Sequence, residues 1–159
     1  AGLSFSAAQP LAYVTQTTLS LDDTRDIIAA LTDKFPHIEG PHVDDICYAT
    51  QNRQTAVRAL AKQVDLVLVV GARNSSNSNR LREVAASEKK PAYLVQDQSE
   101  IKPEWLQGVT SVGITSGAST PEVLVQGVVQ ALSQHAGTRV HTLPGVQEDV
   151  LFRLPAELM

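Results

Sequence analysis

The feature that most constrains this chain is the apolar run DLVLVV at residues 65–70. Strands that are apolar throughout, without alternation, are typical of parallel sheets covered by helices on both faces. The run therefore predicts a buried strand at the centre of an α/β fold. The polar stretch GARNSSNSNR follows it directly and leads into a segment with helical spacing.

The rest of the chain alternates between strand-like and helix-like patterns. We expect strands at residues 11–15, 65–70, 92–95 and 111–114, helices at 22–35, 50–63, 79–88 and 121–135, and short strands in the tail from Thr138. This alternation predicts α/β units of three layers built on parallel sheets. In the first helix, the spacing of Ile27, Ile28 and Leu31 predicts that they face inward.

The N-terminal and C-terminal parts of the chain differ in how much of an α/β unit each one contains. Residues 46–136 contain a self-sufficient α/β unit, whereas residues 1–40 supply only one strand and one helix. Either these elements join the larger sheet, or their partners are missing from this chain. We predict a partial α/β unit at 1–43 and a complete unit with a C-terminal tail at 44–159. An apolar face of the partial unit would then be exposed or covered by another chain, which predicts self-association or disorder in residues 1–40.

Charge and composition exclude several classes of function. The formal net charge is -4 and Lys and Arg form no cluster, so nucleic-acid binding is not expected. No apolar run approaches the ~20 residues of a membrane span. The single cysteine, Cys47, excludes an internal disulfide framework and fits a reducing compartment. Because the first residues also make a poor signal peptide, we expect a cytoplasmic protein.

Three junctions between a strand and a helix are rich in hydroxyl and amide side chains: residues 12–20, 69–80 and 112–122. Each could be an ordinary helix cap. Ser20 and Asp23 form a plausible cap pair, and Ser119 with Glu122 fits a capping box. Each junction nevertheless carries more polar side chains than one cap uses. Ligands of open parallel sheets bind at such junctions, where helix N-termini attract anions, so a phosphate or diphosphate pocket is the second interpretation.

Cys47 lies just ahead of the second long helix and has two interpretations. It is either a buried structural cysteine or, at a helix N-terminus, a nucleophile or metal ligand. One cysteine alone cannot hold an iron–sulfur cluster, which needs several thiolates. A hydrolase built on Cys47 and His42 would lack a clear third member.

Four motifs, in this order and spacing, closely resemble the hydroxymethylbutenyl diphosphate reductase family. They are TQTTLS at 15–20, DDICYAT with NRQ at 44–54, VVG with NSSNSNRL at 69–81, and GAS with Pro121 at 117–121. The resemblance covers nearly the whole chain. It implies three α/β units arranged like a clover around a four-iron, four-sulfur cluster held by three cysteines. It also implies reductive removal of an allylic hydroxyl from a diphosphate substrate, with an external electron donor such as flavodoxin or ferredoxin.

The resemblance also assigns roles to individual residues. Cys47 matches the third cluster cysteine, and Thr17 and Thr18 match threonines near the substrate hydroxyl. Four further residues match the diphosphate-binding positions: Ser75, Ser76, Asn77 and Ser119.

The chain also departs from the family pattern. The other two cluster cysteines, the three substrate histidines and the glutamate that delivers a proton lie upstream in the family and are not found here. The resemblance therefore implies the C-terminal portion of the enzyme, with the cluster absent from this chain and the chain inactive alone. The alternative is a stand-alone module that binds phosphate or diphosphate without redox chemistry.

Overall fold

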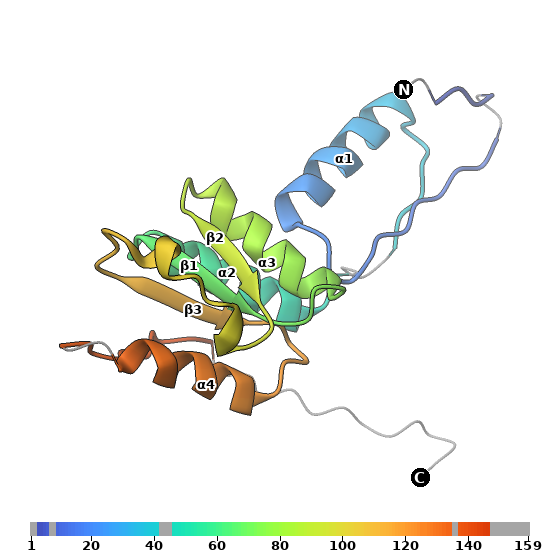
Figure 1. Cartoon of the computed structure of the whole chain (residues 1–159). Helices are drawn as coiled ribbons and strands as arrows, with labels where there is room; N and C mark the ends of the chain where they lie inside the picture. The colour runs from blue at the N-terminus through green and yellow to red at the C-terminus, as the bar shows by residue number, and fades with distance from the viewer. Residues whose placement is uncertain (1–2, 7–8, 42–45, 135–136, 147–159) are drawn as a thin grey trace, which may run out of the picture.

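Three parallel strands form the centre of the fold (Figure 1). Strand β1 (Leu66–Val70) lies between β2 (Ala92–Val95) and β3 (Val112–Ser116), and all of its residues are buried. The expected α/β architecture with a parallel sheet is confirmed. The computed structural model describes residues 3–6, 9–41, 46–134 and 137–146.

Helices cover both faces of this sheet, as the continuous apolar strand predicted (Figure 1). Helices α2 (Tyr48–Ala61) and α3 (Ser76–Ser87) lie on one face, where they pack on the odd-numbered residues of β1. Helix α4 (Glu122–Ser133) lies on the other, where its Val128 packs on the even-numbered residues. Burying a Val or Leu side chain in such a core contributes roughly 1.5–3 kcal/mol.

Two short 3₁₀ helices between β2 and β3 were not predicted. They are η1 (Gln98–Glu100) and η2 (Pro103–Leu106). In η2 the ring of Trp105 stacks on that of Tyr93, with centroids 4.0 Å apart, and both pack against the core under α4. Helices of three and four residues are too short to show a helical period in the sequence.

The described residues before Cys47, here called the N-terminal arm, project from the sheet (Figure 1). The arm contains α1 (Leu21–Lys34). The strand predicted at 11–15 is wrong, because this segment forms only an isolated parallel bridge between Ala12 and Glu39. Within the described residues no further strand adds to this bridge, so the segment lacks the neighbours that would extend it into a sheet.

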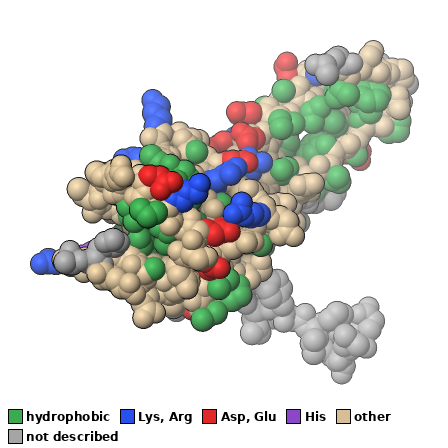
Figure 2. Space-filling view, in the orientation of Figure 1, with side chains coloured by type: hydrophobic (Ala, Val, Ile, Leu, Met, Phe, Trp, Pro, Cys, Tyr) green, Lys and Arg blue, Asp and Glu red, His purple; other side chains and the backbone are tan. Residues whose placement is uncertain are grey.

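Helix α1 leaves much of its apolar face uncovered. Ile27, predicted to face inward, is 59% exposed, and Ile28 and Leu31 are only half-buried. Leu3 and Phe5 of the arm are also exposed. Hydrophobic side chains accordingly gather over the projecting arm in the space-filling view (Figure 2). The amphipathic pattern is real, but in the described structure no sheet lies against this face.

The sequence also predicted short strands in the tail from Thr138. Residues 138–146 form no strand, and the rest of the tail lies outside the described residues. The described helices include none with the length and apolar character that a bilayer crossing requires.

Asp65 fixes the start of β1 against the loop before β3. Its carboxylate accepts hydrogen bonds from the backbone and hydroxyl groups of both Thr110 (3.0 and 2.7 Å) and Ser111 (3.0 and 2.9 Å). These bonds, above all that from the Thr110 hydroxyl, lower the pKa of Asp65 from 3.8 to about 2.

A pH dependence of folding follows from this shift. Because the folded-state pKa is depressed, the ionised Asp65 stabilises the fold above pH 3.8, and this stabilisation is lost as the pH falls towards about 2. We expect Asp65→Asn to lower the free energy of unfolding at pH 7 and to flatten its decline over that acidic range. Urea titrations at a series of pH values measure this, with the exposed Glu104→Gln as control. A variant with the wild-type acid profile would contradict the assignment.

Candidate functional site

Two of the three polar junctions meet at one edge of the sheet. Because β1 and β3 are parallel and in register from Leu66–Val112 to Val70–Ser116, the loops that follow them begin side by side. Two hydrogen bonds tie the second loop to the end of β1: Gly117 N and Thr120 Oγ1 both donate to Val70 O, at 3.1 and 3.0 Å.

A cavity of about 160 Å³ lies between these two loops. Ser75 and Ser119, predicted from different junctions to bind the same anion, both line it. Gln96, from the end of β2, lines it as well, together with Gly71, Ala72, Ser78, Thr120, Pro121 and Leu124. The parallel register thus brings together two side chains that are 44 positions apart in the sequence.

Ser75 is the N-cap of α3. Its backbone is extended, and its Oγ accepts a hydrogen bond from Ser78 N at 3.2 Å. The helix therefore begins at Ser76, three residues earlier than predicted. Because the N-cap residue of α3 lines the cavity, the positive end of the helix dipole lies near it, which favours an anionic ligand.

Ser119 does not cap α4, so the predicted capping box with Glu122 is wrong. The N-cap is Pro121, and no side-chain hydrogen bond caps this helix. Ser119 lies two residues farther from the helix and is exposed, so its hydroxyl cannot serve as the cap. By contrast, the predicted cap of α1 is confirmed, because Ser20 Oγ accepts from Asp23 N at 3.3 Å.

Asn77 is only 9% exposed, and neither amide atom of its side chain has a hydrogen-bond partner among the described residues. Buried polar side chains are nearly always partnered, so this one requires an explanation. Asn77 lies two residues after Ser75, in the first turn of α3, but it is not among the residues that line the cavity of Ser75 and Ser119.

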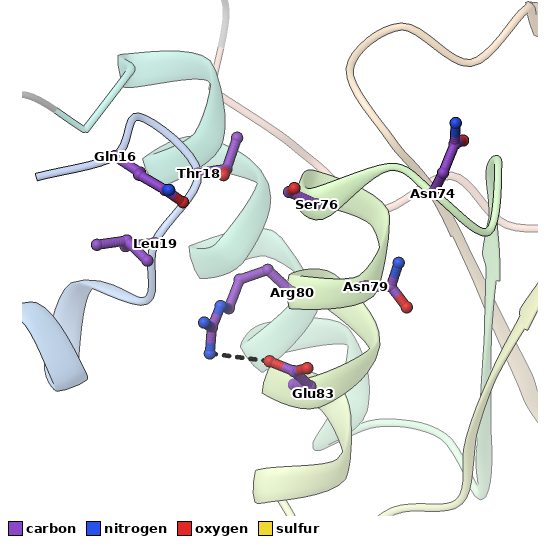
Figure 3. Close-up of a pocket in the computed structure, with 8 residues that line it drawn as sticks. All are labelled: Gln16, Thr18, Leu19, Asn74, Ser76, Asn79, Arg80 and Glu83. Atoms are coloured by element: carbon purple, nitrogen blue, oxygen red, sulfur yellow. Dashed lines mark ion pairs between the residues drawn. The ribbon is translucent and has the colours of Figure 1, made fainter.

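A second hollow, of about 290 Å³, lies between the N-terminal arm and α3 (Figure 3). Thr18 of the arm and Ser76 of α3 lie across it from one another. Its other lining residues are Gln16, Leu19, Asn74, Asn79, Arg80 and Glu83. The predicted binding residues are thus divided: Ser75 and Ser119 line the first cavity, Thr18 and Ser76 line the second hollow, and Asn77 lines neither.

Arg80 is the cation in this second hollow, but two carboxylates already pair with it. Its Nη1 lies 2.8 Å from Glu83 and 3.3 Å from Asp23 of α1. The neighbouring Asp22 pairs with Arg58 of α2. These pairs join the start of α1 to the two helices of the body, so Arg80 positions the arm and is not a free anion ligand.

Cys47 and the TQTTLS loop lie next to each other. Cys47 is exposed, and its backbone N donates to Thr17 O at 3.3 Å. It is the N-cap of α2, with no hydrogen bond from its side chain in that role. The interpretation of Cys47 as a buried structural residue is therefore wrong, and its thiol is accessible.

Gln54 was not identified from the sequence as a site residue, although it supports this loop. It is fully buried in α2, and its Nε2 donates to Leu19 O at 2.7 Å. The available signal was a glutamine at helical spacing from Val57 and Ala61, which the same helix buries. Gln54 fixes the loop that carries Thr17 and Thr18 relative to Cys47.

An ion pair links the loops after β1 and β2, although neither of its members lines the first cavity. The guanidinium of Arg73 donates to Glu100 Oε1 at 2.8 Å, and this bond lowers the pKa of the Glu100 carboxyl. The other carboxylate oxygen accepts from Gln96 N at 2.9 Å. Glu100 thus connects the loop after β1 to the loop after β2, where Gln96 lines the cavity.

Comparison with known proteins gives one consistent result. Residues 3–133 match the sequence model of a family described as LytB protein. The chain is 58% identical over 156 residues to "4-hydroxy-3-methylbut-2-enyl diphosphate reductase 2" of Bradyrhizobium diazoefficiens, covering 98% of this chain and 51% of that protein. It is 59% identical to the protein named reductase 1 of Rhodopseudomonas palustris, covering 99% of this chain and 52% of that one.

A solved structure gives the same result at the level of the fold. The reductase of Plasmodium falciparum described as acting on E-1-hydroxy-2-methyl-but-2-enyl-4-diphosphate superposes with a TM-score of 0.89 at 38% identity. The match covers 98% of this chain and 50% of that one. The chain therefore spans about half the length of the relatives that it matches.

Proposed function

The chain belongs to the LytB protein family, and we propose that it is the C-terminal portion of a reductase acting on (E)-4-hydroxy-3-methylbut-2-enyl diphosphate. The reaction replaces the allylic hydroxyl by hydrogen, consuming two electrons and two protons. It gives isopentenyl or dimethylallyl diphosphate, both isoprenoid precursors, and water. The observation that carries this proposal is the shared cavity of Ser75 and Ser119 at the N-terminus of α3.

The diphosphate is held by neutral donors. Ser75 and Ser119 are proposed to contact it from the two loops around the first cavity, and Ser76 and Asn77, which do not line that cavity, from the first turn of α3. The side-chain amide of Asn77 has no partner among the described residues, and this supports the role, because a bound ligand would supply the missing hydrogen bonds. Thr17 and Thr18 lie on the other side of Ser76, nearer to Cys47, and are proposed to contact the hydroxyl end of the substrate.

Cys47 is proposed as one thiolate ligand of a four-iron, four-sulfur cluster. Its thiol is exposed and makes no capping hydrogen bond, which is compatible with this role. One thiolate does not hold such a cluster, however, so the residues of this chain alone do not fit it. In the whole enzyme such a cluster would supply electron transfer, and the proposed source of the electrons is a donor such as flavodoxin or ferredoxin. The proposed location is the cytoplasm, where thiols stay reduced.

The test uses an extended chain, in which these 159 residues are joined to the half that the relatives have in addition. Under anaerobic conditions with reduced viologen, we expect conversion of the substrate to both products. The alternative, a phosphate-binding module, predicts that the extended chain binds inorganic diphosphate and leaves the substrate unchanged. Reactions without reductant are the control.

We also propose that residues 1–43 are part of an incomplete α/β unit and that 44–159 form a complete unit with its tail. The exposed side chains of the arm support this, since Val14 is 88% and Ile27 59% exposed. Burying such apolar surface stabilises by roughly 25 cal/mol per Å². In the extended chain the added half covers this face, whereas the chain alone covers it by self-association.

Self-association of the chain alone is therefore expected, and it should depend on the arm. Sedimentation velocity should show a coefficient that rises with concentration for the wild type. The double variant Val14→Ser with Ile27→Ser should shift the chain towards monomer. Val123→Ser removes an equally exposed side chain (72%) from α4 and should have no such effect. A wild type that stays a monodisperse monomer would contradict the proposal.

A further inference from the structure

Ser78 is a buried serine in the wall of the proposed diphosphate cavity. It lies in the first turn of α3 and is 1% exposed. Its hydroxyl lies against Gly71 of the loop after β1 and Gly117 of the loop after β3. A Cβ added to either glycine would collide with Ser78 Oγ. Both loops therefore contain glycine where they meet this hydroxyl, and the hydroxyl has little freedom to move.

Ser78 makes two hydrogen bonds to the same atom. Its backbone N donates to Ser75 Oγ at 3.2 Å, and its own Oγ donates to Ser75 Oγ at 3.0 Å. A serine hydroxyl has two lone pairs and one proton. With both lone pairs of Ser75 Oγ accepting from Ser78, the proton of Ser75 can only be donated elsewhere. Ser75 lines the cavity, so the cavity is where this proton is available.

We infer that Ser78 is a positioning residue that holds Ser75 Oγ as a hydrogen-bond donor towards an anionic phosphoryl group in the cavity. This inference rests on the proposed function for the identity of the ligand. A cap serine without Ser78 Oγ would have a free lone pair, and its proton could turn away from the site. Most oxygens of diphosphate are negatively charged acceptors, so a hydroxyl that is oriented to donate binds it more tightly.

The test measures the binding of inorganic diphosphate to this chain, by titration with NMR detection of the backbone amides of residues 75–78. We expect Ser78→Ala to raise the dissociation constant about fivefold, the net effect of one hydrogen bond of about 1 kcal/mol. Ser87→Ala is the matched control. Its hydroxyl is on the same helix and donates to Val84 O at 2.7 Å, far from the cavity, so binding should not change.

A double-mutant cycle separates positioning from a merely structural role. If Ser78 acts through Ser75, then Ser78→Ala should have no further effect on binding in a Ser75→Ala background. Effects that add, or a Ser78→Ala variant that binds like the wild type, would overturn the inference. So would the absence of any amide shift in the wild type. Coupled binding without reductase activity in the extended chain would refute the proposed function and leave the inference standing.

Discussion

No reductase turnover is expected from this chain by itself. The sequence has a single cysteine, whereas a four-iron, four-sulfur cluster needs several thiolates held at fixed positions. Two copies that shared one cluster would still bring only two cysteines. The residues described by the structure also contain no group of three or more His, Cys, Asp or Glu side chains that could hold a metal ion.

The measurement is anaerobic purification followed by reconstitution with iron and sulfide. Iron, sulfide and turnover with reduced viologen are then determined side by side for this chain and the extended chain. We expect only loosely bound iron and background turnover for this chain. A stable four-iron cluster with measurable turnover would show that the fragment proposal is wrong.

The second large effect concerns Cys47. We expect Cys47→Ser to abolish turnover in the extended chain, because a serine hydroxyl does not replace a thiolate ligand. We expect the same substitution to leave the fold at least as stable as in the wild type. Cys47 is exposed at the N-cap of α2 and its side chain makes no capping hydrogen bond, whereas serine is a preferred residue at that position. The free energy of unfolding of this chain should therefore stay the same or rise by about 0.5–1 kcal/mol.

Two measurements together test this assignment. Activity and iron content are measured in the extended chain, and urea unfolding in the 159-residue chain. Loss of activity together with unchanged or increased stability supports a role for Cys47 as a ligand. If Cys47→Ser keeps activity, Cys47 is not a ligand. If it loses activity and also unfolds the chain, its role is structural.

The sequence by itself determined the architecture of the body. Residues 66–70 are apolar at every position, which required a strand buried on both faces and hence helices on both sides of the sheet. It also determined the cap of α1, since Ser20 reaches an amide only three residues away. These features depend on local spacing, and local spacing is visible in the order of the residues.

Most of the predictions that the structure contradicts depend on residues distant in the sequence. The pattern of residues 11–15 is that of a strand, but a strand needs partners, and here only Glu39 pairs with it. Likewise, the helical spacing of Ile27 was correct, but its burial needed a sheet that does not cover α1 in the described residues. The capping box of Ser119 and Glu122 is the exception, because it failed locally: Pro121, two residues after Ser119, is the N-cap of α4.

For the candidate site, the sequence identified the polar junctions and only the tertiary structure decided which of them meet. The register of β1 with β3 places Ser75 beside Ser119, while the arm places Thr18 opposite Ser76. Nothing in the order of the residues distinguished Ser78 from its neighbours. Its importance comes from two glycines in separate loops that converge on one hydroxyl, and such convergence is a property of the packed chain.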